Sequence, residues 1–380
     1  MYRIGIDLGG TNIAAGIVNE SYEIICQESV PTGADRSSEA IADDMAALCR
    51  SVCVKAGIPE TEIASVGIAS PGIANHDDGV IEYSCNLPFR KFPICAYIRE
   101  RFPAPYVFVE NDANAAAWGE AVAGAARGTH NSVMITLGTG VGGGIIIDDK
   151  VYSGFNYAGA ELGHIVIVTD GEPCGCGRHG CWEAYSSATA LIRMTARALD
   201  AARADGRQTL MEDMVAKAGK VSGRTAFDAM RAGDAVATEV VNTYLHYLAQ
   251  GLSNIINIFQ PEVLSIGGGI SNEGDSLLET LVPLIRAEVY GHGVVPDTRI
   301  CIAELKNNAG IIGGTSLVGK GTMTKIREIA PNTKVTIRSS MLPRNGQNTT
   351  NAANVRAAII KGMMGTVPGE GMTVAAMNST

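Results

Sequence analysis

The chain alternates short apolar runs with amphipathic helical patterns. The first run, Arg3–Leu8, predicts a buried strand that ends in a glycine turn, and Ile13–Val18 predicts its hairpin partner. From Ser37 to Ala56, apolar residues recur at helical spacing on one face, which predicts an amphipathic helix. Two further short apolar runs predict strands, at Val66–Ala69 and Val107–Val109.

The same order of elements returns in the second half of the chain. Val133–Leu137 predicts a strand, a glycine turn follows, and Gly144–Ile147 predicts a returning strand. The segment PEVLSIGGG predicts another strand that ends in glycines, and helices are predicted at Ala184–Ala202, Ala235–Phe259, Ser276–Val289 and Asn308–Gly319. A hairpin at the front of each half, followed by alternating strands and helices, predicts an α/β fold with a mixed sheet in each of two lobes.

Composition narrows the class of protein. With 380 residues the chain is long enough for two lobes, and no run of about 18 apolar residues predicts a membrane span. The start, MYRIGIDLGG, has no basic region ahead of a long apolar core, so we expect no signal peptide and a cytoplasmic location. The formal net charge of −9 disfavours nucleic acid as a main partner.

The last sixty residues differ from the rest. They hold seven Lys or Arg and two Glu, they are rich in Asn, Thr and Met, and they have no core periodicity. This composition predicts a weakly ordered polar extension at residues 321–380, with a basic binding tail as the less favoured alternative. We assign the extension no function.

Three glycine turns follow predicted strands: IDLGGTN at Ile6–Asn12, LGTGVGGG at Leu137–Gly144 and SIGGG at Ser265–Gly269. Glycine lets backbone N–H groups converge on an anion, and Asp7 can hold a hydrated Mg²⁺. None of the turns matches a P-loop or a good Rossmann fingerprint. Any one of them alone would fit a tight hairpin turn, but three at strand ends favour the phosphates of a nucleotide.

A polar triplet, Glu110, Asn111 and Asp112, stands where a strand passes into a helix. Such a triplet can simply cap the helix, but Asn111 could cap while Asp112 points into a cleft. A kinase needs one carboxylate to accept the proton of the acceptor hydroxyl, and Asp112 is the candidate. Upstream, the loops SPG and CNLPF would suit a polyhydroxylated ligand, with Asn86 able to donate to and accept from a sugar hydroxyl pair.

The segment ELGHIVIVTDGEPCGCGRHGCWEAY carries three cysteines and a histidine at metal-ligand spacing. One His and three Cys match a closed tetrahedral zinc site, which we favour over unligated thiols. Glu161 and Glu183 flank this site, and together with a zinc-bound imidazole N–H they fit the hydroxyls of a pyranose. His179 is expected to face solvent. The other six cysteines are expected to be core or surface fillers: Cys26, Cys49, Cys53, Cys85, Cys95 and Cys301.

DLGGT, LGTGVGGG and GGG together resemble the actin-like ATPase superfamily, which has a ribonuclease H-like fold. The pair GAELGH and CGCGRHGCWE resembles the ROK family (repressor, open reading frame, kinase), and the resemblance runs from Tyr2 to Gly319. It implies two lobes, separated by a cleft, that close over MgATP. The residues it implies for the nucleotide are Asp7, Gly9, Gly10, Thr11 and Asn12 from one lobe, and Thr139, Gly140, Gly142, Gly268 and Gly269 from the other.

The resemblance also implies a sugar site, a metal site and domain limits. The metal would be a structural zinc on His164, Cys174, Cys176 and Cys181. The lobes would be 1–117 (small) and 118–308 (large, with a zinc knuckle at 161–183), and a C-terminal helix at 309–320 would pack back on the small lobe. The sugar would be held by Gly72, Asn86, Asn111, Asp112, Glu161, His164 and Glu183, with Asp112 as the base.

The first functional hypothesis is an ATP-dependent hexose kinase, in the first place a glucokinase. Alternatives within the family are kinases for N-acetylmannosamine, N-acetylglucosamine or fructose, and a sugar-sensing repressor. A repressor needs a helix-turn-helix module ahead of DLGGT, and Asp7 stands almost at the start. An Hsp70-like chaperone lacks support because no peptide-binding β domain is predicted. ATP or polyphosphate could be the donor, and a homodimer is the usual state of the family.

Overall fold

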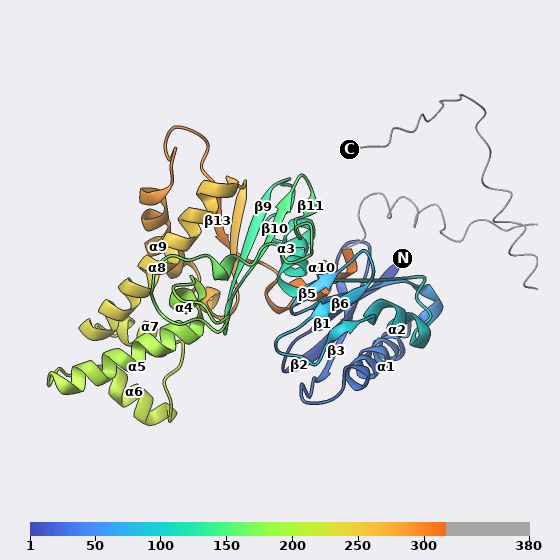
Figure 1. Ribbon diagram of the computed structural model, residues 1–380, viewed down its shortest axis with the longest axis horizontal. Helices are drawn as coiled ribbons and strands as arrows, with labels where there is room; N and C mark the ends of the chain where they lie inside the picture. Colours follow the sequence, from blue (N-terminus) through green and yellow to red (C-terminus); the bar gives the residue numbers. More distant parts are fainter. Residues whose placement is uncertain (317–380) are drawn as a thin grey trace, which may run out of the picture. The chain divides into compact units, whose positions relative to one another are not determined.

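The computed structural model describes residues 1–316 (Figure 1). The predicted extension at 321–380, and the last residues of the predicted final helix, lie outside this range. Among residues 1–316, no helix has both the length and the apolar composition needed to cross a bilayer. The lobe boundaries at residues 117 and 308 stay a prediction.

The first sheet has five strands in the order β3-β2-β1-β4-β8. The predicted hairpin is confirmed, since β1 and β2 are antiparallel, whereas β1, β4 and β8 are parallel to one another. Helices α1 (Ser38–Ala56) and α2 (Ile94–Arg101) lie side by side next to this sheet (Figure 1). The strands are β1 (Tyr2–Leu8), β2 (Asn12–Val18), β3 (Ile24–Pro31), β4 (Ile63–Ser70) and β8 (Tyr106–Asn111).

Helix α1 forms where the apolar periodicity predicted it. The hydroxyl of Ser37 accepts a hydrogen bond from the N–H of Ala40 at its start, and Gly57 ends it in the left-handed conformation at φ 67°. Its buried face includes the four residues that set the periodicity: Ile41, Met45, Leu48 and Val52.

The second sheet has the order β11-β10-β9-β12-β13, with β9 and β10 antiparallel as predicted. Its strands are β9 (Ser132–Leu137), β10 (Val141–Ile147), β11 (Lys150–Val151), β12 (Val263–Gly267) and β13 (Arg299–Ile302). The long helix α8 packs against α5, α7 and α9, and these helices share one hydrophobic core with the sheet. The helices are α4 (Glu183–Ser186), α5 (Ala188–Ala204), α6 (Leu210–Ala218), α7 (Thr225–Arg231), α8 (Ala235–Phe259) and α9 (Asp275–Glu288).

The predicted continuous helix at Ala184–Ala202 is wrong. Ser187 is extended (φ −76°, ψ 163°), and its hydroxyl accepts a hydrogen bond from the N–H of Ala190 as the cap of α5. A serine can make this hydrogen bond only when it stands just before a helix, in an extended conformation. The bond therefore favours a second helix that begins after Ser187 over one continuous helix. The chain therefore turns here, between α4 and α5.

A small third sheet, β5-β6-β7, was not predicted. Its strands are too short to show a clear alternation of apolar and polar residues: β5 (Ile73–Asn75), β6 (Val80–Tyr83) and β7 (Arg90–Phe92). The turn between β6 and β7 carries the CNLPF loop. Short 3₁₀ helices lie at Glu60–Glu62 (η1), Leu162–His164 (η2), Gly269–Glu273 (η3) and Lys306–Asn308 (η4).

Two helices connect the large sheets. Helix α3 (Asp112–Ala123) packs on β9 and β10 and against α10 (Ala309–Ser316), which packs on β1 and β4. Glycines permit this close approach, because a Cβ on Gly5 would lie 1.9 Å from the carbonyl oxygen of Ile311 and a Cβ on Gly313 would lie 1.7 Å from that of Ala115. Since side chains alternate along a strand, Asp7 lies on the same face of β1 as Gly5, toward α10.

Candidate active site

A cavity of about 570 Å³ is lined by elements of both large sheets and by the helices between them. Every residue predicted for the sugar lines it: Gly72, Asn86, Asn111, Asp112, Glu161, His164 and Glu183. Five of the residues predicted for the nucleotide line it as well: Asp7, Gly140, Gly142, Gly268 and Gly269. The fold thus brings residues from distant parts of the chain to one site.

The other predicted nucleotide residues are Gly9, Gly10, Thr11, Asn12 and Thr139, and they are not among the lining residues. The β1–β2 turn is closed by a hydrogen bond of 2.9 Å from the N–H of Gly9 to the carbonyl of Asn12. The side chain of Thr139 is exposed, and its carbonyl accepts a hydrogen bond of 2.8 Å from the hydroxyl of Thr189. A phosphate-binding role for these turns stays a prediction.

Several lining residues were missed from the sequence. Ser271 and Asn272 follow the third glycine turn, and their side chains donate to the carbonyls of Gly268 and Gly269 at 2.7 and 3.0 Å. Lys306 and Asn307 line the cavity from the polar run before α10, and that run was the available signal for them. Ala309 and Gly310, at the start of α10, line it as well. Cys85, expected to be a filler, also lines the cavity, because the CNLPF loop faces it.

Asn111 and Asp112 divide two tasks at the start of α3, as predicted. The side-chain oxygen of Asn111 accepts the N–H groups of Ala113 and Asn114 at 2.9 and 3.1 Å, and so caps the helix. Its amide nitrogen donates to the carbonyl of Gly72 at 3.0 Å. Asp112 is left to line the cavity, with one oxygen accepting the N–H of Ala113 at 2.8 Å.

Burial shifts the pKa of three acids of the cavity upward. Burial, and next the charge of Asp112, raise the pKa of Asp7 to about 6. Burial also raises the pKa of Asp112, against the opposing effect of the Ala113 N–H, and it raises the pKa of Glu161. Such a site suits ligands that bring a cation or that donate hydrogen bonds from hydroxyls.

Glu183 joins the cysteine-rich segment to the second glycine turn. Its Oε2 accepts the N–H of Val141 at 3.0 Å, and its Oε1 lies 3.6 Å from the sulfur of Cys174. A Cβ on Gly140 would lie 2.3 Å from the same Oε2, so this approach of the carboxylate requires glycine there. The turn and the cysteine-rich segment are therefore held in one arrangement.

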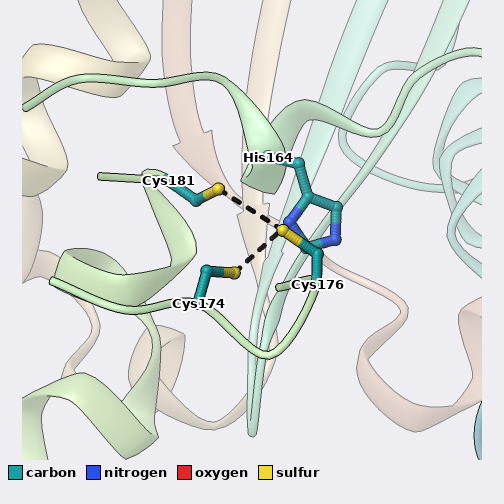
Figure 2. A group of neighbouring side chains, drawn as sticks. All are labelled: His164, Cys174, Cys176 and Cys181. Atoms are coloured by element: carbon teal, nitrogen blue, oxygen red, sulfur yellow. Dashed lines mark hydrogen bonds between the residues drawn. The ribbon is translucent and has the colours of Figure 1, made fainter. Parts of the chain in front are cut away.

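His164, Cys174, Cys176 and Cys181 converge, with their ligand atoms all within 4.8 Å of one another (Figure 2). Cys174 Sγ lies 3.7 Å from His164 Nδ1, and Cys176 Sγ lies 3.7 Å from Cys181 Sγ. A tetrahedral zinc ion with Zn–S bonds of about 2.3 Å has ligand atoms about 3.7 Å apart, so the spacing fits. These four residues could hold a metal ion.

The three thiols also differ in acidity. Hydrogen bonds from Arg178 lower the pKa of Cys176, whereas burial raises the pKa of Cys174 and Cys181. Thiolates this close repel one another, so without a cation only one of them is favoured. A bound divalent cation would offset this repulsion and so allow all three cysteines to be thiolates. His179, next to this group, is exposed as expected.

Comparison with known proteins fits this geometry. The family model described as "ROK family" matches residues 3–320. The chain belongs to the ROK family. A glucokinase of Streptomyces coelicolor is 36% identical over 314 residues, which cover 83% of this chain and 96% of that protein.

Solved structures agree with the ROK assignment. The crystal structure of a ROK family glucokinase from Streptomyces griseus, in complex with glucose and AMPPNP, has a TM-score of 0.70 at 34% identity and covers 83% of this chain and 99% of that chain. A ROK hexokinase from Thermus thermophilus has a TM-score of 0.70 at 32% identity and covers 86% and 100%. This ROK protein thus has the mixed α/β, actin-like ATPase fold of the ROK kinases.

Proposed function

We propose that this ROK protein is an ATP-dependent glucokinase that transfers the γ-phosphoryl group to the 6-hydroxyl of glucose. The observation that carries the proposal is the single cavity that gathers Asp112, the predicted sugar residues and Asp7 beside two glycine turns. The glucokinase and hexokinase relatives, which align over most of the chain, support the same activity.

Asp112 acts as the general base. As the bond from the sugar O6 to phosphorus forms and the bond from phosphorus to the leaving ADP oxygen breaks, the O6 proton passes to the free carboxylate oxygen of Asp112. Burial moves the pKa of Asp112 upward, toward neutral pH, and a general base is most effective when its pKa lies near the working pH. Glu110 is not a rival, since it is 4% exposed, does not line the cavity and is already hydrogen-bonded.

Asp7 would hold a hydrated Mg²⁺, and the glycine turns would hold the phosphates. MgATP supplies the phosphoryl group and the cation that offsets its charge. The raised pKa of Asp7 is what a carboxylate that binds a cation would show in the absence of that cation, because burial and the charge of Asp112 both disfavour its ionised form. Gly268 and Gly269 lie on the nucleoside side in this arrangement.

The sugar is held by amide, carboxylate and imidazole groups from separate segments: Gly72 and Asn86, Asn111 at the helix cap, Glu161, His164 and Glu183. The side chains of this set offer acceptors or donors to the ring hydroxyls, and Gly72 offers its backbone. A pocket built to bond a hydroxyl rejects analogues that lack it, because its own polar groups are left unpaired. Glucose, with equatorial hydroxyls at C2, C3 and C4, is the substrate we expect.

His164, Cys174, Cys176 and Cys181 hold a structural zinc ion. With four protein ligands, a zinc ion bound there would have no open position for substrate. It would keep the segment between Glu161 and Glu183 rigid and would leave the second imidazole nitrogen of His164 protonated as a donor. We also propose a homodimer, which light scattering coupled to size exclusion would test.

The deciding experiment is a coupled ADP-release assay over a panel of sugars. We expect the highest kcat/KM for glucose, lower values for mannose and glucosamine, and a poor rate with fructose. Polyphosphate in place of ATP tests the donor. A kcat/KM for N-acetylmannosamine or N-acetylglucosamine well above that for glucose would leave a kinase but remove the glucokinase assignment. Absence of turnover with every sugar would favour the sugar-sensing alternative.

A further inference from the structure

A buried carboxylate lies directly behind the proposed base. Glu110 is the next-to-last residue of β8 and is 4% exposed. Its Oε1 accepts the N–H of Asn111 at 2.9 Å and the side-chain amide of Asn114 at 3.1 Å. Its Oε2 lies 3.0 Å from His76 Nδ1 and 3.4 Å from the hydroxyl of Ser153. These partners come from three separate segments of the chain.

The first pair of contacts holds one residue on each side of Asp112. Asn111 precedes it and caps α3, and Asn114 lies in the first helical turn. Glu110 accepts hydrogen bonds from the backbone of Asn111 and from the side chain of Asn114. A shift of this carboxylate would therefore shift the first turn of α3. Because Glu110 does not line the cavity, it can affect the reaction only through its neighbours.

The second pair ties this helix start to the segment that carries Glu161. Since a carboxylate only accepts hydrogen bonds, His76 Nδ1 must carry the proton that it shares with Glu110. The His76 ring meets the Tyr157 ring edge-on, with centroids 4.9 Å apart, and the Tyr157 hydroxyl donates to Asp77 at 2.7 Å. Tyr157 has φ 63°, an unfavourable conformation that its contacts must hold in place.

The segment from Ser153 onward connects β11 of the second sheet to Gly159, Ala160 and Glu161, which line the cavity. His76 follows β5, which packs against β8 of the first sheet. The cluster of Glu110, His76, Ser153 and Tyr157 therefore joins the start of α3 to the loop of the sugar-binding acids, outside the cavity itself.

We propose that Glu110 and His76 form a positioning pair that sets the orientation of Asp112 and couples it to the 153–161 segment. The inference rests on the proposed kinase function with Asp112 as the base. His76 is not a catalytic residue, because it touches neither substrate nor the reacting atoms. Its contribution is to hold Glu110, and through Glu110 the first turn of α3, in the orientation that aims the base.

His76 is the better residue to change. Removing Glu110 would leave buried N–H groups unpaired and could unfold the helix start, whereas the His76 side chain is 39% exposed. His76→Phe keeps a ring against Tyr157 but removes the donor, and His76→Gln supplies an amide donor. His292→Phe is the matched control, because that histidine contacts a carboxylate of Asp297 at 2.9 Å but does not line the cavity.

We expect His76→Phe to lower kcat about tenfold or more with little change in the KM for ATP, since a small misplacement of a base costs rate rather than nucleotide binding. His76→Gln should recover most of the loss, and His292→Phe should match the wild type. In an Asp112→Asn background, His76→Phe should cost no further rate, because the pair acts through that carboxylate. An equal loss in both backgrounds, or a full kcat in His76→Phe, would overturn the proposal.

Hydrogen exchange gives a readout that needs no turnover. His76→Phe should speed the exchange of the amides of Ala113 and Asn114 and of the 153–161 segment, while His292→Phe leaves them unchanged. Unchanged exchange in His76→Phe would contradict the positioning pair. If the wild type phosphorylates no sugar, the proposed function fails, whereas the exchange data still decide whether His76 orders the start of α3.

Discussion

The carboxylate of Glu183 accepts the backbone N–H of Val141 at 3.0 Å while its other oxygen lies 3.6 Å from the sulfur of Cys174. One side chain thus links the proposed zinc site to the second glycine turn. A substitution that disrupts the metal site should therefore also weaken sugar and phosphate binding, although a zinc ion held by four protein ligands would not contact the substrate.

The purified protein should carry about one zinc ion per chain, measured by elemental analysis. Cys176→Ser should lower the zinc content, the thermal midpoint and the affinity for glucose together, because the same segment carries Glu161 and Glu183. Cys26→Ser, on β3 and outside the group, should change none of these. Fully active protein without zinc would exclude the structural metal.

Asp112→Asn should lower kcat by about 100-fold or more, the usual scale for loss of a general base. The amide is nearly isosteric and can still bond a hydroxyl, so calorimetry should show that glucose binding survives. Asp213→Asn, on the exposed side of α6, is the control and should be fully active. Near-normal turnover of Asp112→Asn would place the base elsewhere in the cavity.

Asp7 should make the unliganded protein less stable as the pH rises. Its pKa is about 6 in the folded protein against 3.8 as the ordinary value, so the folded state binds the proton more tightly. The stability this supplies is fully present below about pH 3.8 and is lost as the pH rises through about 6. At neutral pH the loss amounts to at most about 3 kcal/mol, at about 1.4 kcal/mol per pKa unit.

Asp7→Asn stays neutral and escapes this loss. In urea unfolding without Mg²⁺ or nucleotide, its advantage in free energy of unfolding over the wild type should grow between about pH 5 and about pH 7.5. Asp213→Asn should follow the wild type at both values. An advantage of Asp7→Asn that is the same at both pH values would show that the carboxyl is not protonated in the folded protein.

Gly313→Ala should destabilise the protein by about 2 kcal/mol or more, because its Cβ would lie 1.7 Å from the backbone oxygen of Ala115 and α3 would have to move away from α10. Activity should fall as well, since α3 begins at Asp112. Gly223→Ala is the control, with its nearest atom, the Cβ of Ala188, at 3.9 Å. Equal unfolding midpoints for the two variants would contradict the close packing of α3 and α10.

Local patterns were sufficient for most elements. The β1–β2 and β9–β10 hairpins and the helices at Ser38–Ala56 and Ala235–Phe259 follow from periodicity and turn residues that act over a few positions. The break at Ser187 was missed because helical propensity on both sides masked one capping hydroxyl. The third sheet was missed because its strands are too short for any period to show.

The candidate chemistry of the site could be predicted wherever the residues are close in sequence. His164 and the three cysteines fall in one segment, and Asn111 and Asp112 are neighbours at a strand-to-helix junction, so spacing alone predicted a metal group and a cap beside a free acid. Lys306 and Asn307 were missed as lining residues, because a polar run before a helix fits an ordinary surface loop equally well. Cys85 was missed because a lone cysteine does not reveal which way its loop faces.

Only the tertiary structure determined which residues from distant segments of the chain lie close together. Asp7 and Asp112 share a cavity because glycines let α10 lie against β1 and against α3, and no local pattern measures that approach. Glu110 joins β8, the residues after β5 and those after β11 for the same reason. Short-range propensities choose each element, but burial and close packing between elements set the distances on which the chemistry depends.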